Sequence, residues 1–178
     1  MDRAVLLMYE ISRGNCSTFM TSSLIAVRPA KADDIPLLSA MASRMTDFHH
    51  RLDPFNLPGI RTLEAHKEYF ARIIGEDDAY CYVLLSGTHI AGYATARIRE
   101  MNPYFVVPRI GHIENIYVDP RYRRMGLSRF ALEKLFADFK ARGVTYADLS
   151  VDVRNASGVE AWKDAGFEKW RYLMRRKL

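Results

Sequence analysis

The sequence predicts a three-layer α/β domain with a central mixed sheet and helices on both faces. Helical and strand patterns alternate along the chain, and hairpin patterns interrupt that alternation. The chain has 178 residues, of which 49% are hydrophobic and 26% charged. This composition is ordinary for one globular domain with a core of its own.

The amino-terminal residues differ from the rest of the chain. Residues 12–23 are polar and without a regular pattern, so we expect residues 1–23 to form an N-terminal extension and residues 24–178 to form the domain. The apolar run Ala4–Met8 is shorter than the core of a secretory signal, and no apolar run reaches the ~18 residues of a membrane span. Two cysteines provide no disulfide framework. We therefore expect a cytoplasmic protein without a membrane partner.

The first part of the domain has the pattern strand, helix, loop, helix. An apolar run predicts a short strand at 24–28. Asp33 or Asp34 can cap a helix that ends where the segment 47–60 begins. That segment holds two prolines and a glycine and is predicted to be mostly loop. A capping-box pattern then begins a second helix, at 62–74.

The second part of the domain alternates strands and helices. Ser86-Gly87-Thr88 separates two strand patterns and indicates a hairpin. Apolar residues every four positions indicate an amphipathic helix at 127–141, with Lys134 and Asp138 as an exposed pair. In order, the predicted elements are strands at 79–85, 89–99 and 111–118, the helix at 127–141, a strand at 144–153, a short helix capped by Asn155, and a last strand at 167–177.

The turn before the helix at 127–141 predicts a site for a phosphate-bearing ligand. The first N–H groups of a helix have no partners within it, and the helix dipole favours negative charge there. Arginines add charge-assisted hydrogen bonds to phosphate oxygens, and glycine lets the backbone approach a ligand closely. The alternative is an ordinary basic turn. The expected cradle consists of Arg123, Arg124, Met125, Gly126, Leu127 and Ser128.

The charge distribution favours an anionic cofactor over a nucleic-acid surface. The net charge is +5, but the basic residues gather at 121–129 and 171–177 and form no even stripe. We therefore expect no nucleic-acid partner. The adjacent histidines His49 and His50 suggest a metal, but no third ligand follows at a helical spacing. No metal site is expected.

Three landmarks in order give the chain a resemblance to the GNAT superfamily of acetyl-CoA-dependent N-acetyltransferases. The family signature Gln/Arg-x-x-Gly-x-Gly/Ala is matched by the six residues 123–128, except that Ser128 replaces the final small residue. Asn155 and the pair Gly166-Phe167 follow at the family spacing. Between them, Trp162 stands where many members have a tyrosine that acts as a general acid. Residues 24–38 resemble the opening strand and helix, so the resemblance covers the whole domain.

The resemblance implies a fold and a cofactor. We expect a GNAT-like α/β/α domain whose mixed, mostly antiparallel sheet splays between its fourth and fifth strands. Acetyl-CoA would be the co-substrate, with its pyrophosphate in the cradle. Its pantetheine arm would lie along backbone groups of Ile116, Tyr117 and Val118, near Asn155 and Trp162. The implied reaction moves an acetyl group from acetyl-CoA to a primary amine of a small molecule, peptide or protein.

Two residues are candidates for the proton acceptor. An alkyl ammonium has a pKa of about 10.4, so a neutral amine must be generated near pH 7. Glu114 could accept that proton, and His112, two residues earlier on a regular strand, would share its face. The alternative to a catalytic role is a solvated or salt-bridged carboxylate for Glu114 and a partly buried strand histidine for His112. Trp162 cannot protonate a leaving thiolate, so packing is its expected role.

The acceptor side is less defined. The resemblance places it near Phe48, His49 and Asp53; Asp53 could attract a cationic amine or be a solvated turn residue. The missing tyrosine also motivates a second hypothesis, a non-catalytic acyl-CoA-binding module. The identity of the amine and the choice between monomer and homodimer are left open by the sequence.

Overall fold

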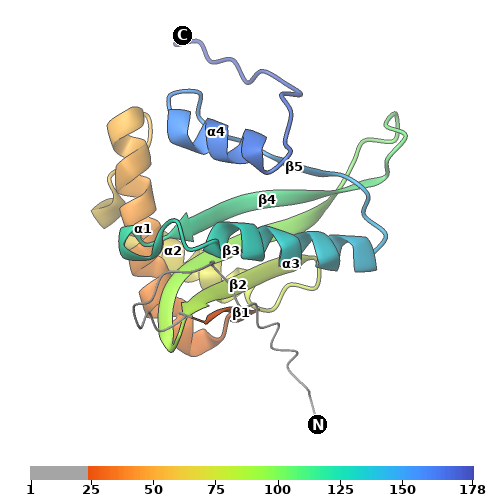
Figure 1. Ribbon diagram of the computed structural model, residues 1–178. Helices are drawn as coiled ribbons and strands as arrows, with labels where there is room; N and C mark the ends of the chain where they lie inside the picture. The colour runs from red at the N-terminus through yellow and green to blue at the C-terminus, as the bar shows by residue number, and fades with distance from the viewer. Residues whose placement is uncertain (1–23) are drawn as a thin grey trace, which may run out of the picture.

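The computed structural model describes residues 24–178; the predicted extension at 1–23 lies outside them. Five strands form one sheet in the order β1-β2-β3-β4-β5 (Figure 1). The first four are antiparallel neighbours, and β5 is parallel to β4. The strands are β1 (Ile25–Pro29), β2 (Ala79–Ser86), β3 (His89–Glu100), β4 (Arg109–Val118) and β5 (Ala147–Leu149).

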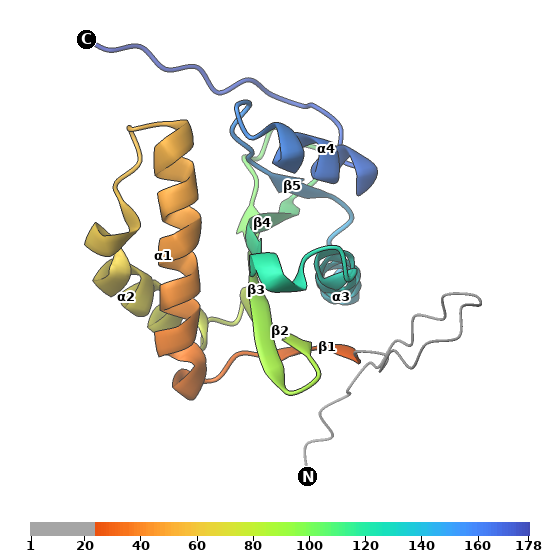
Figure 2. The same ribbon diagram turned by 60° about the vertical axis from the view of Figure 1, so that its left-hand side comes forward.

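Four α-helices cover the two faces of this sheet. They are α1 (Ile35–Leu52), α2 (Leu63–Ile73), α3 (Leu127–Ala141) and α4 (Ala156–Asp164). Helices α1 and α2 lie on one face, and α3 and α4 lie on the other (Figure 2). The predicted three-layer fold with a mixed, mostly antiparallel sheet is confirmed. None of the helices in the described part of the chain combines the length and apolarity that a bilayer crossing requires.

Each face of the sheet has its own core. The α3 side buries Leu84, Ala94 and Ile113 against the helix stripe. That stripe, predicted from its four-residue spacing, is formed by Leu127, Ala131, Leu135 and Phe139, all nearly inaccessible. The α1 and α2 side buries a second cluster that includes Phe70, Val83 and Tyr93. Alternation along the strands sends neighbouring residues to opposite cores, so the sheet is anchored from both sides.

Helix α1 is longer than the sequence predicted. The segment 47–60 was expected to be mostly loop, but the helix continues to Leu52. Its end is set by Pro54, because a residue before proline is disfavoured in the α region. Asp53 accordingly adopts an extended conformation, with φ −147° and ψ 109°. Six further residues, including His49, therefore stand on a helix.

Three other predictions about the second half are wrong. The strand predicted at 144–153 is reduced to Ala147–Leu149, because only three residues pair with β4. None of the described residues after α4 forms a strand; a strand pattern needs a neighbouring strand to bond with. The pair Lys134 and Asp138 is not exposed, because α3 lies across β2 and both side chains bond to the hydroxyl of Tyr82.

Two glycine substitutions test the close approach of β3 and β4. A Cβ on Gly92 would lie 2.1 Å from the carbonyl oxygen of Tyr117, so Gly92→Ala should lower the free energy of unfolding by about 1–3 kcal/mol. Gly75→Ala is the matched control, because a Cβ there meets no atom within 4 Å; it should change stability by less than about 1 kcal/mol. Urea unfolding of both variants measures the difference. Equal stabilities would contradict the close approach.

Candidate active site

Strand β4 contains a β-bulge at Glu114. Thr95 of β3 faces Asn115, whereas the next residue, Ala96, faces Ile113. Glu114 is therefore the extra residue of β4 and has no cross-strand partner. A bulge bends its strand and interrupts the ladder locally. In the sequence, its one sign is the pair of adjacent polar residues Glu114 and Asn115, which breaks the alternation between Ile113 and Ile116.

Strands β4 and β5 separate immediately beyond this bulge. Their last pair is Ile113 with Leu149, whereas β4 itself continues to Val118. The N–H of Asp119 donates to Ala91 of β3, at 2.8 Å. Because backbone groups alternate between the two edges of a strand, the preceding N–H, that of Val118, points away from β3 and into the gap. The splay expected from the family resemblance is thus present.

The same alternation separates the three residues expected to meet the cofactor arm. Ile116 shares the orientation of Val118, so its backbone groups also face the gap. The carbonyl oxygen of Tyr117 instead faces Gly92 of β3, and its ring lies in the core beneath α1 and α2. Backbone contacts in the gap are therefore assigned to Ile116 and Val118.

The residues of the predicted cradle form a tight turn that leads into the N-terminus of α3. Gly126, the N-cap of α3, has φ +84°, and Arg124 has φ +64°. The first helical hydrogen bond runs from Phe130 to the carbonyl of Gly126, at 3.0 Å, so the N–H groups of residues 127–129 precede it and have no partners within the helix. The side chain of Arg123 donates to the carbonyl of Val118, at 3.1 Å. This bond joins the cradle to the end of the splayed strand.

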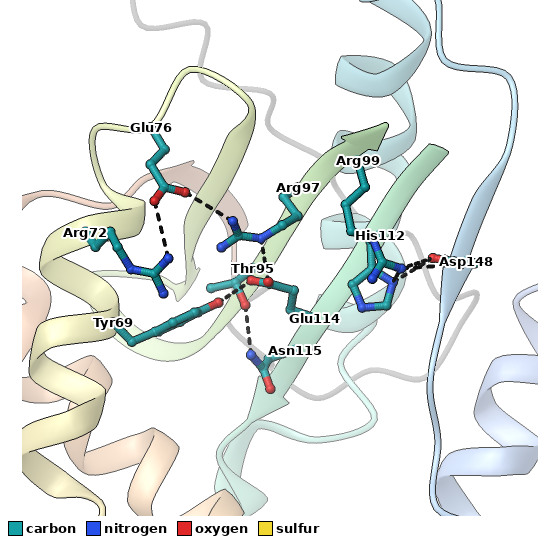
Figure 3. A network of polar contacts seen from close by, with 10 residues as sticks. All are labelled: Tyr69, Arg72, Glu76, Thr95, Arg97, Arg99, His112, Glu114, Asn115 and Asp148. Atoms are coloured by element: carbon teal, nitrogen blue, oxygen red, sulfur yellow. Dashed lines mark hydrogen bonds and ion pairs between the residues drawn. The ribbon is translucent and has the colours of Figure 1, made fainter. Parts of the chain in front are cut away.

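Glu114 is held by two side chains on the α1 and α2 face of the sheet. The hydroxyl of Tyr69 donates to Oε2, at 2.5 Å, and Nε of Arg97 donates to Oε1, at 2.6 Å (Figure 3). Arg97 also pairs with Glu76 of the loop after α2. Burial, and then the bond to Glu114, raises the pKa of Tyr69 well above its ordinary range. The salt-bridged alternative for Glu114 therefore describes this structure.

His112 lies on the same face as Glu114 but belongs to a separate network. Ile113 between them faces the α3 core, which places both neighbours on the opposite face. Nδ1 of His112 is 2.6 Å from Oδ1 of Asp148 and 2.5 Å from Nη2 of Arg99. Neither Tyr69 nor Asp148 was singled out in the sequence, because each lies on a different element, far away along the chain.

The downstream landmarks have the structural roles expected of them. Oδ1 of Asn155 accepts the N–H of Gly158, at 3.0 Å, which confirms the predicted helix cap. Trp162 packs edge-on against Phe167, with ring centroids 5.6 Å apart, and both rings contact the α3-side core. Their contact with a cofactor arm stays a prediction.

The three residues expected on the acceptor side lie at the end of α1 and just beyond it. Phe48 is partly exposed, and burial lowers the pKa of His49 despite nearby Asp152. Asp53 is only 7% exposed and accepts from Arg154 at 2.6 Å and from Arg175 at 2.7 Å. The solvated-turn interpretation of Asp53 is therefore wrong: two distant segments converge on it.

Other kinds of centre receive little support. Within residues 24–178, no group of three histidine, cysteine, aspartate or glutamate side chains could hold a metal ion. His50 instead contacts the carbonyl of Asn56, at 2.6 Å. Burial raises the pKa of the Cys81 thiol to about 12, so this cysteine is not an activated nucleophile.

Comparison with known families defines the class of the protein as an acyltransferase. The model of the Acetyltransferase (GNAT) family matches residues 45–167, which is more than half of the chain. The chain therefore belongs to the GNAT acetyltransferase family.

Similar proteins include a curated N-acetyltransferase and several solved structures. The [ribosomal protein bS18]-alanine N-acetyltransferase of Escherichia coli K12 is 40% identical over 55 residues, which are 31% of this chain and 37% of that enzyme. The match thus spans little more than a third of that relative. A predicted acetyltransferase from Clostridium acetobutylicum, solved with acetyl-CoA, has a TM-score of 0.69 at 21% identity and covers 86% of this chain and 96% of its own.

A second solved structure is AAC(6')-Iy in complex with the bisubstrate analogue CoA-S-monomethyl-acetylneamine. It has a TM-score of 0.65 at 18% identity, and the match covers 86% of this chain and 98% of that one. At such identities the two structures establish the shared fold and nothing about the acceptor.

The ion pairs of Asp53 predict a pH dependence of stability. Hydrogen bonds from Arg154 and then Arg175 hold the pKa of Asp53 well below its ordinary value. A depressed carboxyl pKa stabilises the fold above the unfolded value of about 3.9, and this contribution is lost as the pH falls below it. Asp53→Asn should therefore be less stable than the wild type at pH 5–7, and the difference should shrink below about pH 4.

Thermal unfolding of both proteins across this pH range measures the effect. Asp33→Asn, which changes an exposed carboxylate, is the control and should follow the wild type throughout. A stability difference for Asp53→Asn that stays constant down to pH 3 would contradict the ion-pair assignment.

Proposed function

We propose that the protein transfers the acetyl group of acetyl-CoA to a primary amine of a small molecule, peptide or protein. The proposal is carried by one observation: the free N-terminus of α3 is tied by Arg123 to Val118, where β4 has left β5. An anion site and an open strand edge are thereby adjacent. A ligand with a diphosphate at one end and an amide-containing arm at the other suits this arrangement.

Each part of the cofactor would have its own residues. The pyrophosphate would lie in the cradle from Arg123 to Ser128, where helix N–H groups and arginines supply donors. The arm would bond to backbone groups of Ile116 and Val118, with Asn155 and Trp162 beside it. Acetyl-CoA supplies an acyl group activated as a thioester. The residues of the chain then need only position the thioester beside the amine and transfer the protons of that amine.

The chemistry requires a proton acceptor and an oxyanion donor. Glu114 and His112 lie on the polar face of β4 and are the candidates for accepting the ammonium proton. The N–H of Val118 points into the gap and would polarise the thioester carbonyl. A thiol has an ordinary pKa of about 8.5, so the thiolate can leave without the tyrosine that Trp162 replaces.

The acceptor would approach from the α1 and α2 face, where Phe48, His49 and Asp53 end α1. The curated relative is an alanine N-acetyltransferase that acts on a ribosomal protein, and the analogue in AAC(6')-Iy carries acetylneamine. Both a peptide N-terminus and a small amine are therefore candidates, and a monomer and a homodimer are both compatible with the proposal.

A matched pair of glycine variants tests the cradle. Gly126→Glu places an anion at the N-terminus of α3 and should weaken acetyl-CoA binding at least 100-fold, because like charges repel there. Gly143→Glu is the control: it lies just beyond the other end of α3, also has positive φ, +73°, and meets no neighbouring atom. It should keep the affinity of the wild type. Calorimetric titration measures both, and equal affinities would refute the cradle.

An amine panel tests the reaction itself. Acetyl-CoA is mixed with the protein and with alanine-terminated peptides, polyamines, aminoglycosides or lysine-containing peptides, and thiol release is recorded. We expect at least one amine to raise thiol release about tenfold or more above the rate without acceptor. Binding of acetyl-CoA without turnover of any amine would favour the acyl-CoA-binding module, and no binding at all would contradict both.

A further inference from the structure

His112 and Asp148 face one another across the parallel pair of β4 and β5. They form the middle of the three cross-strand pairs, beside the point where the strands separate. Nδ1 of the histidine lies 2.6 Å from Oδ1 of the aspartate (Figure 3). Both side chains are mostly buried, at 17% and 23% exposed. Backbone pairing, rather than a flexible loop, thus fixes this contact.

The contact determines which ring nitrogen carries the proton. A carboxylate only accepts hydrogen bonds, so the short contact requires a proton on Nδ1. Arg99 also approaches Nδ1, at 2.5 Å, but its Nη2 has Asp148 as an alternative acceptor, at 3.1 Å. With Arg99 donating to Asp148 in this way, we assign the proton of the neutral ring to Nδ1, which leaves the lone pair on Nε2.

Glu114 is less available as a base than His112. Each of its oxygens already accepts a short hydrogen bond, one from Arg97 and one from Tyr69. Three charged side chains face His112: Arg97 and Arg99 of β3, and Asp148 of β5. Arg97 is the cross-strand partner of His112. Glu114 lies two residues away on β4. Imidazole is the side chain whose ordinary protonation range lies nearest to neutral pH, which suits a general base.

Open space adjoins Asp148 and Arg99, the two side chains that contact His112. A cavity of about 450 Å³ lies between the β3–β4 connection and the residues after α4. Its walls include Arg99, Asp148 and the rings of Tyr104, Phe105 and Trp170. An amine in this cavity would meet Asp148, whose carboxylate contacts Nδ1 of His112.

We propose that Asp148 is a positioning residue that orients His112, and that Nε2 of His112 accepts the proton of the acceptor ammonium. This inference rests on the proposed acetyl transfer. The first proton passes from the ammonium to Nε2 and on to water. The amine nitrogen then bonds to the acetyl carbon, the carbon–sulfur bond breaks, and the second proton from nitrogen goes to the departing thiolate. Glu114 stays bound to Arg97 and Tyr69 throughout.

Kinetics of five variants test this role with the fastest amine of the panel. Asp148→Asn should lower kcat by about 10- to 100-fold. It should also displace the acidic limb of the pH profile of kcat/KM and leave the KM for acetyl-CoA unchanged. Asp148→Glu should recover part of the loss. His112→Gln should lower kcat at least as much, and adding Asp148→Asn to it should have no further effect. Asp78→Asn, which changes an exposed carboxylate paired with Arg142, controls for altered surface charge.

A spectroscopic measurement judges the geometry without turnover. Imidazole nitrogen NMR of the wild type above neutral pH should show His112 protonated at Nδ1, and Asp148→Asn should move that proton to Nε2. A wild-type ring protonated at Nε2, or a loss from Asp148→Asn that persists in full on the His112→Gln background, would overturn the proposal. Acetyl-CoA binding with no turnover of any amine would overturn the proposed function, and the base role with it.

Discussion

The site depends on one interruption of the sheet, the bulge at Glu114 followed by the separation of β4 from β5. Backbone N–H and C=O groups in a folded protein are almost always bonded. Beyond Ile113, the edge of β4 that faces β5 has lost its strand partner, so its groups bond to a side chain, as the carbonyl of Val118 does to Arg123, or to water or a ligand. A strand that pairs on one side only is a template for an extended ligand. The bulge thus turns an interior strand into a binding edge.

The helix N-terminus and the strand edge act together because the turn between them is pinned. The carboxylate of Asp119 accepts hydrogen bonds from the backbone N–H and from the side chain of Arg121. The side chain of Arg123 donates to the carbonyl of Val118. Positive φ at Arg124 and Gly126 lets this turn reverse direction within a few residues. The donors of α3 consequently open beside the gap and not at an arbitrary point on the surface.

Charges on the other face of the sheet are arranged in pairs that balance one another. Glu114 is matched by Arg97, and Asp148 by Arg99. A half-buried charge without a partner is costly, and its pairing fixes the side-chain geometry. Farther out, Asp53 joins the end of α1 to Arg154 and to Arg175 near the carboxyl terminus. The end of α1, where the acceptor is proposed to bind, is therefore bounded by segments from three parts of the chain, held by ionic contacts.

The layers of the fold, the stripe of α3, the cap at Asn155 and the turn that begins α3 could be predicted from the sequence, because each depends on a local pattern or on a turn with special backbone angles. The bulge left only a slight trace, the two adjacent polar residues Glu114 and Asn115 between Ile113 and Ile116, and this break in alternation does not by itself specify an extra residue. Asp53 and the segment 167–177 were also misjudged from the sequence, because their surroundings come from distant residues. Contacts such as Tyr69 with Glu114 and His112 with Asp148 were decided by the tertiary structure alone, because they require strand register and helix placement that no local pattern encodes.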